Sequence, residues 1–526
     1  MGVMPTPIRW SPPIPLSPAE AAVAQHLHRN GKFYVFLREI RAELFDEAFQ
    51  AELAAAYAPR GTAPLPAALL AMVTLLQAYD QVSDVEAVTT AQMDRRWQLV
   101  LDCLGCTRAP FSQGALVKFR ARMIAHDLDR KLLDRTVTLA KHTGRFGWQH
   151  LRAALDSSPL VGAGRVQDTW NLIGRALGTV ATCAAKAVGR PRAEVLRAAQ
   201  VTLLGAPSLK AALDLDWDDP AAQAAALARL LAEVDQLEQW VARHVPDRAQ
   251  TAPLRTALAA LRRVLAQDLE PDPVSQGRRI RRGVAADRMP SLGDPEMRHG
   301  RKTRTRPFNG YKRHLLKVLG PNVIVGALVR PANEAEHLTL APLVPTVTVL
   351  GALDELLIDR GYLASPAIPG LHAAGTAIRA KAWTSHNGGR FPKHAFTIDL
   401  VAHTVTCPTA HTIPVRPGAG HVRFPGSVCA PCPQRPACTT APAGTGRSIT
   451  LHPQEALLQP LRAAMRTADG RAVLRDRTSI EHSLARLGQM QGGKARYKGV
   501  RKNTLDVRRC AAVANLEQLR RLKTAA

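Results

Sequence analysis

The chain has 526 residues, 46% of them hydrophobic, and a formal net charge of +27 at pH 7. This length exceeds what one ordinary core organises, so we expect two or three domains, or one domain with large insertions. The hydrophobic content excludes a disordered chain. The charge favours a polyanionic partner, above all nucleic acid, because each neutralised phosphate releases counterions; a ribosomal or membrane-surface partner, or a general basic bias, is the alternative.

The N-terminal sequence MGVMPTPIRWSPPIPLSP lacks the apolar stretch of a signal peptide. No segment reaches the roughly 18 apolar residues that a membrane-spanning helix needs. We therefore expect a cytoplasmic, nucleoid-associated protein with no membrane partner.

Residues 1–145 are predicted to form a helical, DNA-binding domain. Ser83 and Glu86 form a capping box, and Ser112 is placed as the N-cap of a further helix. This last helix presents three basic side chains for DNA: Lys118, Arg120 and Arg122. Such a domain is similar to a helix-turn-helix DNA reader, although a purely structural helical bundle explains the pattern equally well.

The segment LRAALDSSPLVG predicts a buried strand that ends at Asp156. Residues 165–275 return to helical spacing and predict an inserted helical subdomain, in which the acidic stretch from Asp214 to Asp219 forms a turn and a helix start. Residues 278–306 are rich in Arg and Lys without apolar periodicity, which predicts a basic arm for the DNA backbone. The cations chosen there are Arg301, Lys302 and Arg304.

Strand patterns then alternate with a helix. RHLLKVL and VIVGALV precede a helix over His337–Leu343, and the strands ELLID, ending at Asp359, and TAIRAK follow it. This alternation predicts a mixed α/β sheet buried on both faces.

Three carboxylates are placed for metal chemistry. Asp156 and Asp359 each follow an apolar run, and Glu481 lies on a predicted helix with Arg477 four residues before it. Carboxylate oxygens suit Mg²⁺ (or Mn²⁺), and three carboxylates can hold two ions that act on a phosphodiester. Alone, the pattern is also explained by caps and surface ion pairs. Asp354 is the alternative to Asp359, and we place it outside the site.

Three strings in this order resemble the DDE transposases of bacterial insertion sequences: ALDSSPLVGAGRVQDTW, LLIDRGYL and RTSIEHSLARL. The nearest match is the insertion-sequence eleven-eighty-two group. The resemblance covers nearly the whole chain and implies an RNase H-like catalytic core over residues 150–526. It also implies that Asp156, Asp359 and Glu481 are the catalytic, Mg²⁺-binding residues, with Arg477 supporting them.

Two positions depart from the Y-x2-R-x3-E-x6-K signature of related transposases, with Leu474 in place of Tyr and Gly488 in place of Lys. A Gly-rich basic loop that follows could take over their contacts with DNA. Its candidates are Lys494, Arg496, Tyr497 and Lys498.

A cysteine cluster predicts a second, structural metal site. Its thiols are those of Cys407, Cys429, Cys432 and Cys438. Their spacing suits a tetrahedral Zn²⁺ site in a ribbon-like insertion over residues 385–450 that interrupts the core. His411 or His421 could replace one cysteine, and a loop of free thiols is the alternative.

The sequence thus predicts an enzyme that cuts the ends of its insertion sequence and joins them to target DNA by two-metal phosphoryl transfer. Its partners are terminal inverted repeats and target DNA, and the resemblance implies a homodimer or larger assembly on DNA. The alternatives are a non-catalytic DNA-binding regulator derived from a transposase and an RNase H-like nuclease.

Overall fold

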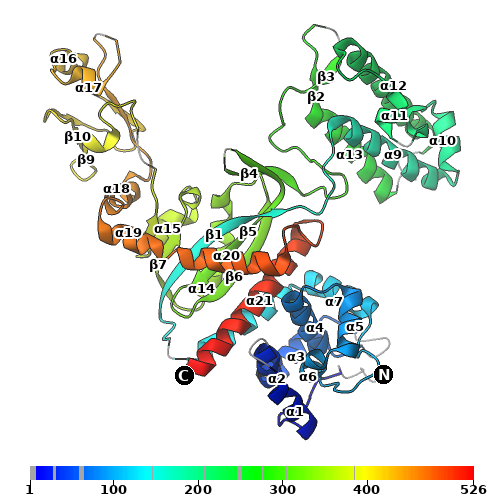
Figure 1. The fold of residues 1–526 in the computed structure, drawn as a ribbon. Helices are drawn as coiled ribbons and strands as arrows, with labels where there is room; N and C mark the ends of the chain where they lie inside the picture. Colours follow the sequence, from blue (N-terminus) through cyan, green and yellow to red (C-terminus); the bar gives the residue numbers. More distant parts are fainter. Residues whose placement is uncertain are drawn as a thin grey trace, which may run out of the picture.

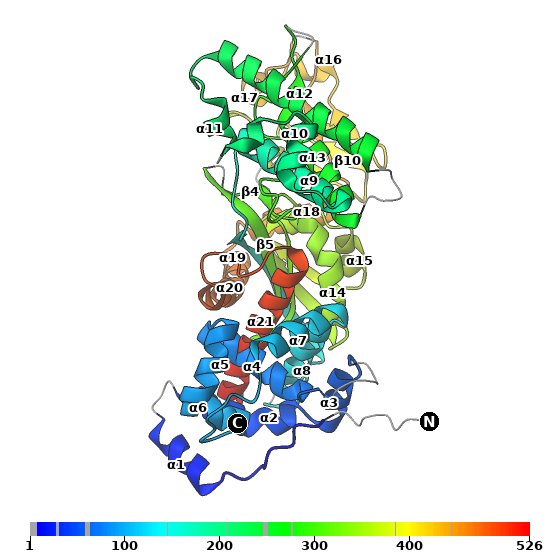
Figure 2. The ribbon, with the colours of Figure 1, turned by 90° about the vertical axis from the view of Figure 1, so that its right-hand side faces the viewer.

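The computed structural model describes residues 8–27, 31–57, 64–144, 146–206, 208–245, 251–274, 277–303, 305–383, 386–442 and 444–525. A central sheet lies between a group of N-terminal helices at one end and two inserted units at the other (Figure 1, Figure 2). One inserted unit is helical and the other is rich in cysteine. Among the helices in these ranges, none has the length and apolar character needed to cross a lipid bilayer.

The N-terminal part is helical, as predicted. Its capping box at Ser83 and Glu86 is present, and the Ser112 side chain accepts a hydrogen bond from the backbone N–H of Ala115 at the start of the next helix. The helices are α1 (Pro18–His26), α2 (Lys32–Leu44), α3 (Glu47–Ala54), α4 (Ala67–Asp80), α5 (Asp84–Met93), α6 (Arg95–Leu101), α7 (Gln113–Ala125) and α8 (Leu128–His142). Nearly every residue of α4 is buried, so this helix forms the centre of the group.

The central sheet is mixed, which confirms the predicted α/β class. Its strands are β1 (His150–Val161), β4 (Arg298–Thr303), β5 (Arg306–Val318), β6 (Val323–Pro331), β7 (Ala352–Ile358) and β8 (Ala377–Ala380). β1 lies between β5 and β7; it is antiparallel to β5 and parallel to β7, which in turn is parallel to β8. The other edge of β5 pairs with β4 near its start and with β6 further along.

Two strand predictions differ from the structure. β1 does not end at Asp156 but continues to Val161, because it keeps its antiparallel pairing with β5 after its pairing with β7 has stopped at Leu155. The segment 278–306 is not simply a loop, since it contains the short β3 (Arg278–Ile280) and the hairpin strand β4. Backbone pairing orders this hairpin although its sequence lacks apolar periodicity.

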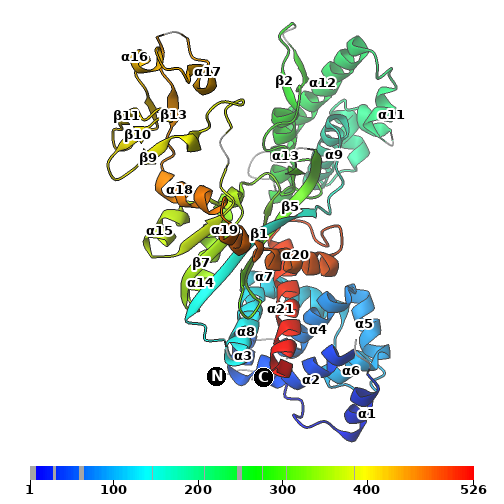
Figure 3. The same cartoon turned by 60° about the vertical axis from the view of Figure 1, so that its left-hand side comes forward.

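Helices cover the sheet and connect it to the N-terminal part. α14 (Leu340–Thr348) packs on β5, β6 and β7, α15 (Ala367–Ala373) packs on β8, and α20 (Thr478–Gln491) packs on β1 and β5. The last helix, α21 (Val500–Ala525), lies against β6 and also against α4 and α8 (Figure 3). The sheet and the N-terminal helices therefore share one apolar core, and the predicted boundary at residue 145 stays a prediction.

The helical unit between β1 and β4 has an apolar core of its own. Asp219 caps its longest helix, which agrees with the helix start predicted for this acidic stretch. Its elements are α9 (Thr169–Val188), α10 (Arg192–Ala198), η2 (Leu203–Gly205), α11 (Leu209–Leu213), α12 (Pro220–His244), α13 (Ala252–Asp268) and β2 (Leu269–Pro271), which pairs with β3.

The cysteine-rich unit follows β8 and has a third, small core built around Phe396 and Phe424. Its elements are η6 (Lys393–Ala395), β9 (Thr397–Asp399), β10 (Thr404–Thr406), β11 (Thr412–Pro414), β12 (His421–Arg423), α16 (Gly426–Cys429), α17 (Arg435–Cys438) and β13 (Ser448–Thr450). α18 (Glu455–Ala464) and α19 (Ala468–Arg475) then lead back to α20 at the sheet.

Candidate active site

Asp156 and Asp359 occupy adjacent positions on two parallel strands. The register of β1 and β7 places Leu155 opposite Ile358, and in each strand the next residue is an aspartate. The carboxylate of Asp156 accepts a hydrogen bond from the Ser157 N–H at 2.8 Å. Asp359 caps the short helix η5 (Arg360–Tyr362) and accepts from the Arg360 N–H at 2.8 Å. The sheet therefore holds the backbone of both aspartates side by side, at the end of the paired segment of β1 and β7.

Glu481 joins this pair through an arginine. Arg477 is the N-cap of α20, and Glu481 lies in the first turn of that helix. The Arg477 guanidinium donates to Asp156 Oδ2 at 2.8 Å through Nη1 and to Glu481 Oε1 at 3.1 Å through Nη2. The structure thus brings the predicted residues together, with Arg477 between two of the carboxylates.

The electrostatics of Asp156 reflect its burial and its neighbours. Burial raises the pKa of Asp156 to about 6; Arg477 opposes this rise, while the negative charges of Asp359 and Glu481 add to it. Gathering like charges in a partly desolvated place is costly, and a bound cation relieves that cost. The site therefore favours a positively charged ligand.

Asp354, the alternative to Asp359, lies at the other end of β7. Its carboxylate is 3.0 Å from the ring nitrogen Nδ1 of His150, at the start of β1, and both side chains are largely exposed. Asp354 therefore has a partner at the far end of β7 from Asp359, and its place outside the site stays a prediction.

The donor chemistry of the three carboxylates suits a divalent metal. Within the described ranges, no three His, Cys, Asp or Glu side chains are grouped so that they could hold a metal ion. At the three carboxylates, the Arg477 guanidinium provides the positive charge that a divalent cation would otherwise supply. Oxygen ligands of this type are those that Mg²⁺ prefers.

Comparison with protein families gives two matches on this chain. The family described as Transposase DDE domain matches residues 406–520, and that described as Transposase domain (DUF772) matches residues 22–122. Both matched segments belong to transposase families and support a DDE transposase of the bacterial insertion-sequence type. The first match includes Arg477 and Glu481, whereas Asp156 and Asp359 lie outside both matched segments. No curated protein and no solved structure matches the transposase, and the eleven-eighty-two group stays a prediction.

Membership of this family implies DNA as a partner and a divalent metal as a cofactor. The basic residues predicted to contact DNA lie in three groups: on α7, on the β4–β5 hairpin and on the loop after α20. On α7, Lys118 is exposed, but the two arginines are used within the protein. Arg120 pairs with Asp84, with one contact at 2.7 Å, and the Arg122 guanidinium lies 4.3 Å from the centre of the Tyr57 ring. Of the three, only Lys118 is presented freely, and the DNA role of this helix stays a prediction.

The β4–β5 hairpin carries the second basic group. Arg301 and Lys302 are exposed on β4, close to the tip at which Thr303 pairs with Arg306. Arg304 lies outside the described residues. The hairpin thus presents cations to solvent, as a DNA-contacting arm requires.

The Gly-rich loop between α20 and α21 forms the third group. Lys494 and Lys498 are exposed, whereas Arg496 donates hydrogen bonds to the backbone carbonyls of Gln81 and Val82 after α4. Tyr497 is partly buried, with the Arg509 guanidinium 5.8 Å from its ring centre. Arg496 therefore tethers the loop to the N-terminal helices, and the two lysines are the side chains available to a backbone phosphate.

The departure at Gly488 has a steric explanation. A Cβ at this position would lie 3.0 Å from a guanidinium nitrogen of Arg313, which reaches α20 from β5. Arg313 donates to Ser158 Oγ and to Gln491 Oε1, each at 2.7 Å. The buried guanidinium of Arg313, which comes from β5, thus lies beside the helix position at which related transposases have a lysine. At the other departure, Leu474 lies on α19 and is partly buried.

The four cysteines of the insertion line one small cavity of about 30 Å³, together with His411. Burial raises the pKa of the Cys438 thiol, and the other three thiols lie close enough to contribute. They are nevertheless not grouped as metal ligands in the described part of the chain, so the zinc expectation is not supported. His421 lies on β12 and is not among the residues lining this cavity.

The sequence did not predict a group of buried hydrogen bonds at the start of α21. Asp294 begins a turn, in which its backbone carbonyl accepts from the Met297 N–H, and its fully buried side chain accepts hydrogen bonds from the Tyr311 hydroxyl and from the Gly499 N–H, the latter at 2.9 Å. Glu296 accepts from the Val500 N–H at 3.0 Å. Because these contacts join residues about two hundred positions apart, no local pattern could have revealed them.

Proposed function

We propose that this transposase cuts phosphodiester bonds at the ends of its insertion sequence and joins the freed 3'-ends to target DNA. The observation that carries the proposal is the adjacency of Asp156 on β1 and Asp359 directly after β7, with Glu481 linked to Asp156 through Arg477. An isolated carboxylate is usually a cap or a surface partner, but three from separate parts of the chain at one sheet edge are typical of phosphoryl transfer.

Asp156, Asp359 and Glu481 would hold Mg²⁺, or Mn²⁺ in its place, with room for two ions in a three-carboxylate set. When bound, such ions activate the attacking oxygen and stabilise the leaving oxygen of the phosphodiester. The chain itself orients the groups. β1 and β7 hold the aspartates, and Arg477 holds Glu481 toward Asp156 and offsets part of their negative charge.

The remaining task of the protein is to hold a polyanion beside three carboxylates. A formal net charge of +27 opposes the repulsion between DNA and these carboxylates. The exposed cations of the β4–β5 hairpin and of the Gly-rich loop are available for the DNA backbone. Positioning and charge neutralisation are thus the contributions of this chain to the reaction.

The test is Mg²⁺-dependent cleavage of DNA that carries the element's ends. We expect Asp156→Asn, Asp359→Asn and Glu481→Gln each to lower the rate by at least about a hundredfold while DNA binding is retained. Asp354→Asn is the matched control, since it removes a carboxylate from the same strand outside the site, and it should cleave at the native rate.

Two results would point elsewhere. End-specific binding without any cleavage by the native protein would favour a regulator derived from a transposase. Metal-dependent cleavage without preference for the element's ends would favour an RNase H-like nuclease.

A further inference from the structure

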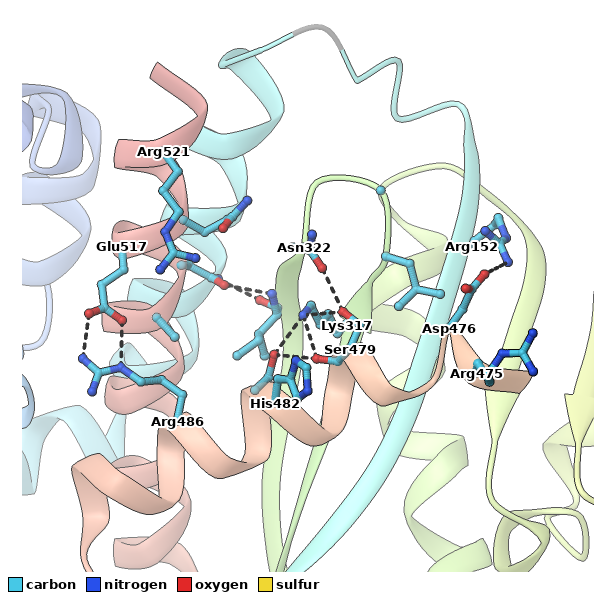
Figure 4. A pocket seen from close by; sticks show the side chains of 17 residues that line it. Arg152, Lys317, Asn322, Arg475, Asp476, Ser479, His482, Arg486, Glu517 and Arg521 are labelled. Carbon is cyan, nitrogen blue, oxygen red and sulfur yellow. Dashed lines mark hydrogen bonds and ion pairs between the residues drawn. The ribbon is translucent and has the colours of Figure 1, made fainter. Parts of the chain in front are cut away.

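A basic cavity lies beside α20, on the flank opposite Glu481. Its volume is about 960 Å³, and its walls come from α20, α21, the turn between β5 and β6, and the start of β1 (Figure 4). The cationic and titratable basic side chains in these walls are Arg152, Lys317, Arg475, His482, Arg486 and Arg521. None of them was singled out from the sequence.

The charges of this cavity are not balanced within the protein. Its two carboxylates are already paired, Asp476 with Arg152 at 2.8 Å and Glu517 with Arg486 at 2.6 Å. Lys317, Arg475 and Arg521 have no carboxylate partner in the described part of the chain. An excess of positive charge in a concave site concentrates anions there.

Lys317 lines the cavity from β5. It is only 5% exposed, yet its Nζ donates solely to neutral groups: Ser479 O at 3.1 Å, and Ser479 Oγ and Ser483 Oγ at 2.9 Å each. Burial lowers the pKa of Lys317 to about 8. A buried ammonium without a counter-ion is costly, and an anion bound nearby would reduce that cost. Because its three donors are already used, Lys317 contributes charge, whereas the exposed Arg475 and Arg521 can contact the ligand directly.

The position of the cavity indicates which anion it takes. Arg152 and Asp156 lie on β1 with side chains on the same face, four residues apart, which corresponds to about 13 Å at about 3.3 Å per residue. This distance spans about four nucleotides at about 3.4 Å per nucleotide along one strand. The volume exceeds what a single phosphate ion fills, and the wall helix α20 also carries Glu481.

We propose that this cavity binds phosphates in the backbone of the DNA on which the active site acts. The proposal rests on the proposed function for the identity of that DNA. The occupied cavity would hold the strand against α20, so that DNA binding and the placement of Glu481 are linked through one helix.

The test is the salt dependence of DNA binding, measured in EDTA so that no cleavage occurs, with a short duplex that carries one end of the element. We expect Arg475→Gln and Arg521→Gln each to lower the slope of log K against log salt by about 0.9, the value for one lost phosphate contact. Both side chains are exposed, so neither variant should fail to fold. Arg197→Gln, an exposed arginine on α10 away from the cavity, is the control and should keep the native slope.

Native slopes in both variants would overturn the proposal. Binding of inorganic phosphate that depends on Arg475 and Arg521 but does not compete with the duplex at constant ionic strength would also overturn it, since the cavity would then take a free anion. Neither result depends on catalysis. If the active-site variants abolish cleavage while both cavity variants keep the native salt slope, the proposed function stands and this inference fails. If the native protein does not cleave DNA, the salt slopes of the cavity variants still decide the inference.

Discussion

Removing the charge of Asp156 should stabilise the transposase in the absence of metal. Burial raises the pKa of Asp156 to about 6, from a usual value of 3.8, and the side chain is only 14% exposed. An acid with a higher pKa in the folded protein holds its proton more tightly there, so folding loses stability as the pH rises from about 4 to about 6. At about 1.4 kcal/mol per pKa unit, the full penalty above pH 6 is about 3 kcal/mol.

Asparagine resembles the protonated carboxyl, so Asp156→Asn avoids this penalty. We expect the variant to be more stable than the native protein by up to about 3 kcal/mol near pH 7.5, and the difference to vanish near pH 4. The measurement is thermal unfolding of both proteins in EDTA across this range. The difference between them is compared because the three separate cores need not unfold together.

Asp354→Asn is again the control, since this exposed carboxylate on the same strand should change stability by less than about 0.5 kcal/mol at either pH. Added Mg²⁺ should stabilise the native protein more than the Asp156→Asn variant, because a ligand stabilises only the form that binds it. A variant that is no more stable than the native protein near pH 7.5, or a difference that does not change with pH, would refute this account of the site.

Two further predictions concern packing around the site. Leu155→Ala removes a fully buried side chain from β1 and should lower the free energy of unfolding by about 2 to 5 kcal/mol in thermal melts. Leu338→Ala, which truncates an exposed side chain, should have little effect. Equal losses in the two variants would show that β1 is not central to the core. Asp294→Ala leaves the Tyr311 hydroxyl and the Gly499 N–H without their acceptor, which should cost about 1 to 3 kcal/mol and speed hydrogen exchange at Gly499. Unchanged exchange there would mean that the start of α21 does not depend on this carboxylate.

Local rules were sufficient for the helix starts and for most strands. The capping box at Ser83 and Glu86 and the N-cap at Ser112 are signals within three residues of each other, so they survive whatever the tertiary context. The apolar run before Asp359 likewise predicted β7 correctly. The place of the two aspartates could be anticipated because strands that follow such runs end at one edge of a sheet.

The course of β1 after Asp156 could not be predicted in this way. The small residues and Pro159 that follow are typical of a strand end, but from Asp156 to Leu160 this part of β1 pairs with β5 and leaves its other edge, on the side where β7 has ended, without a paired strand among the described residues. Proline is tolerated at an edge, where its missing N–H is not needed for a second ladder. Only knowledge of which strands are neighbours reveals this.

The sequence also could not show which arginines are paired within the protein and which are free to contact DNA. Arg120 was expected to face DNA, but its partner Asp84 lies 36 positions earlier, and Arg496 is held by carbonyls more than four hundred positions away. The unbalanced charge beside α20 comes from segments as distant as Arg152 and Arg521. Net charge indicates the class of partner, whereas the fold decides which cations remain available.

The packing of α21 also has a consequence during synthesis. The helices α4 and α8 cannot complete their shared core until the 26 residues of α21 leave the ribosome. Between His142 and Val500 the ribosome needs roughly 20 to 70 s at about 5 to 20 residues per second. For that time the nascent N-terminal helices expose an apolar surface, and a chain truncated before α21 would keep it exposed. Premature termination should therefore yield an aggregation-prone fragment instead of a free DNA-binding domain.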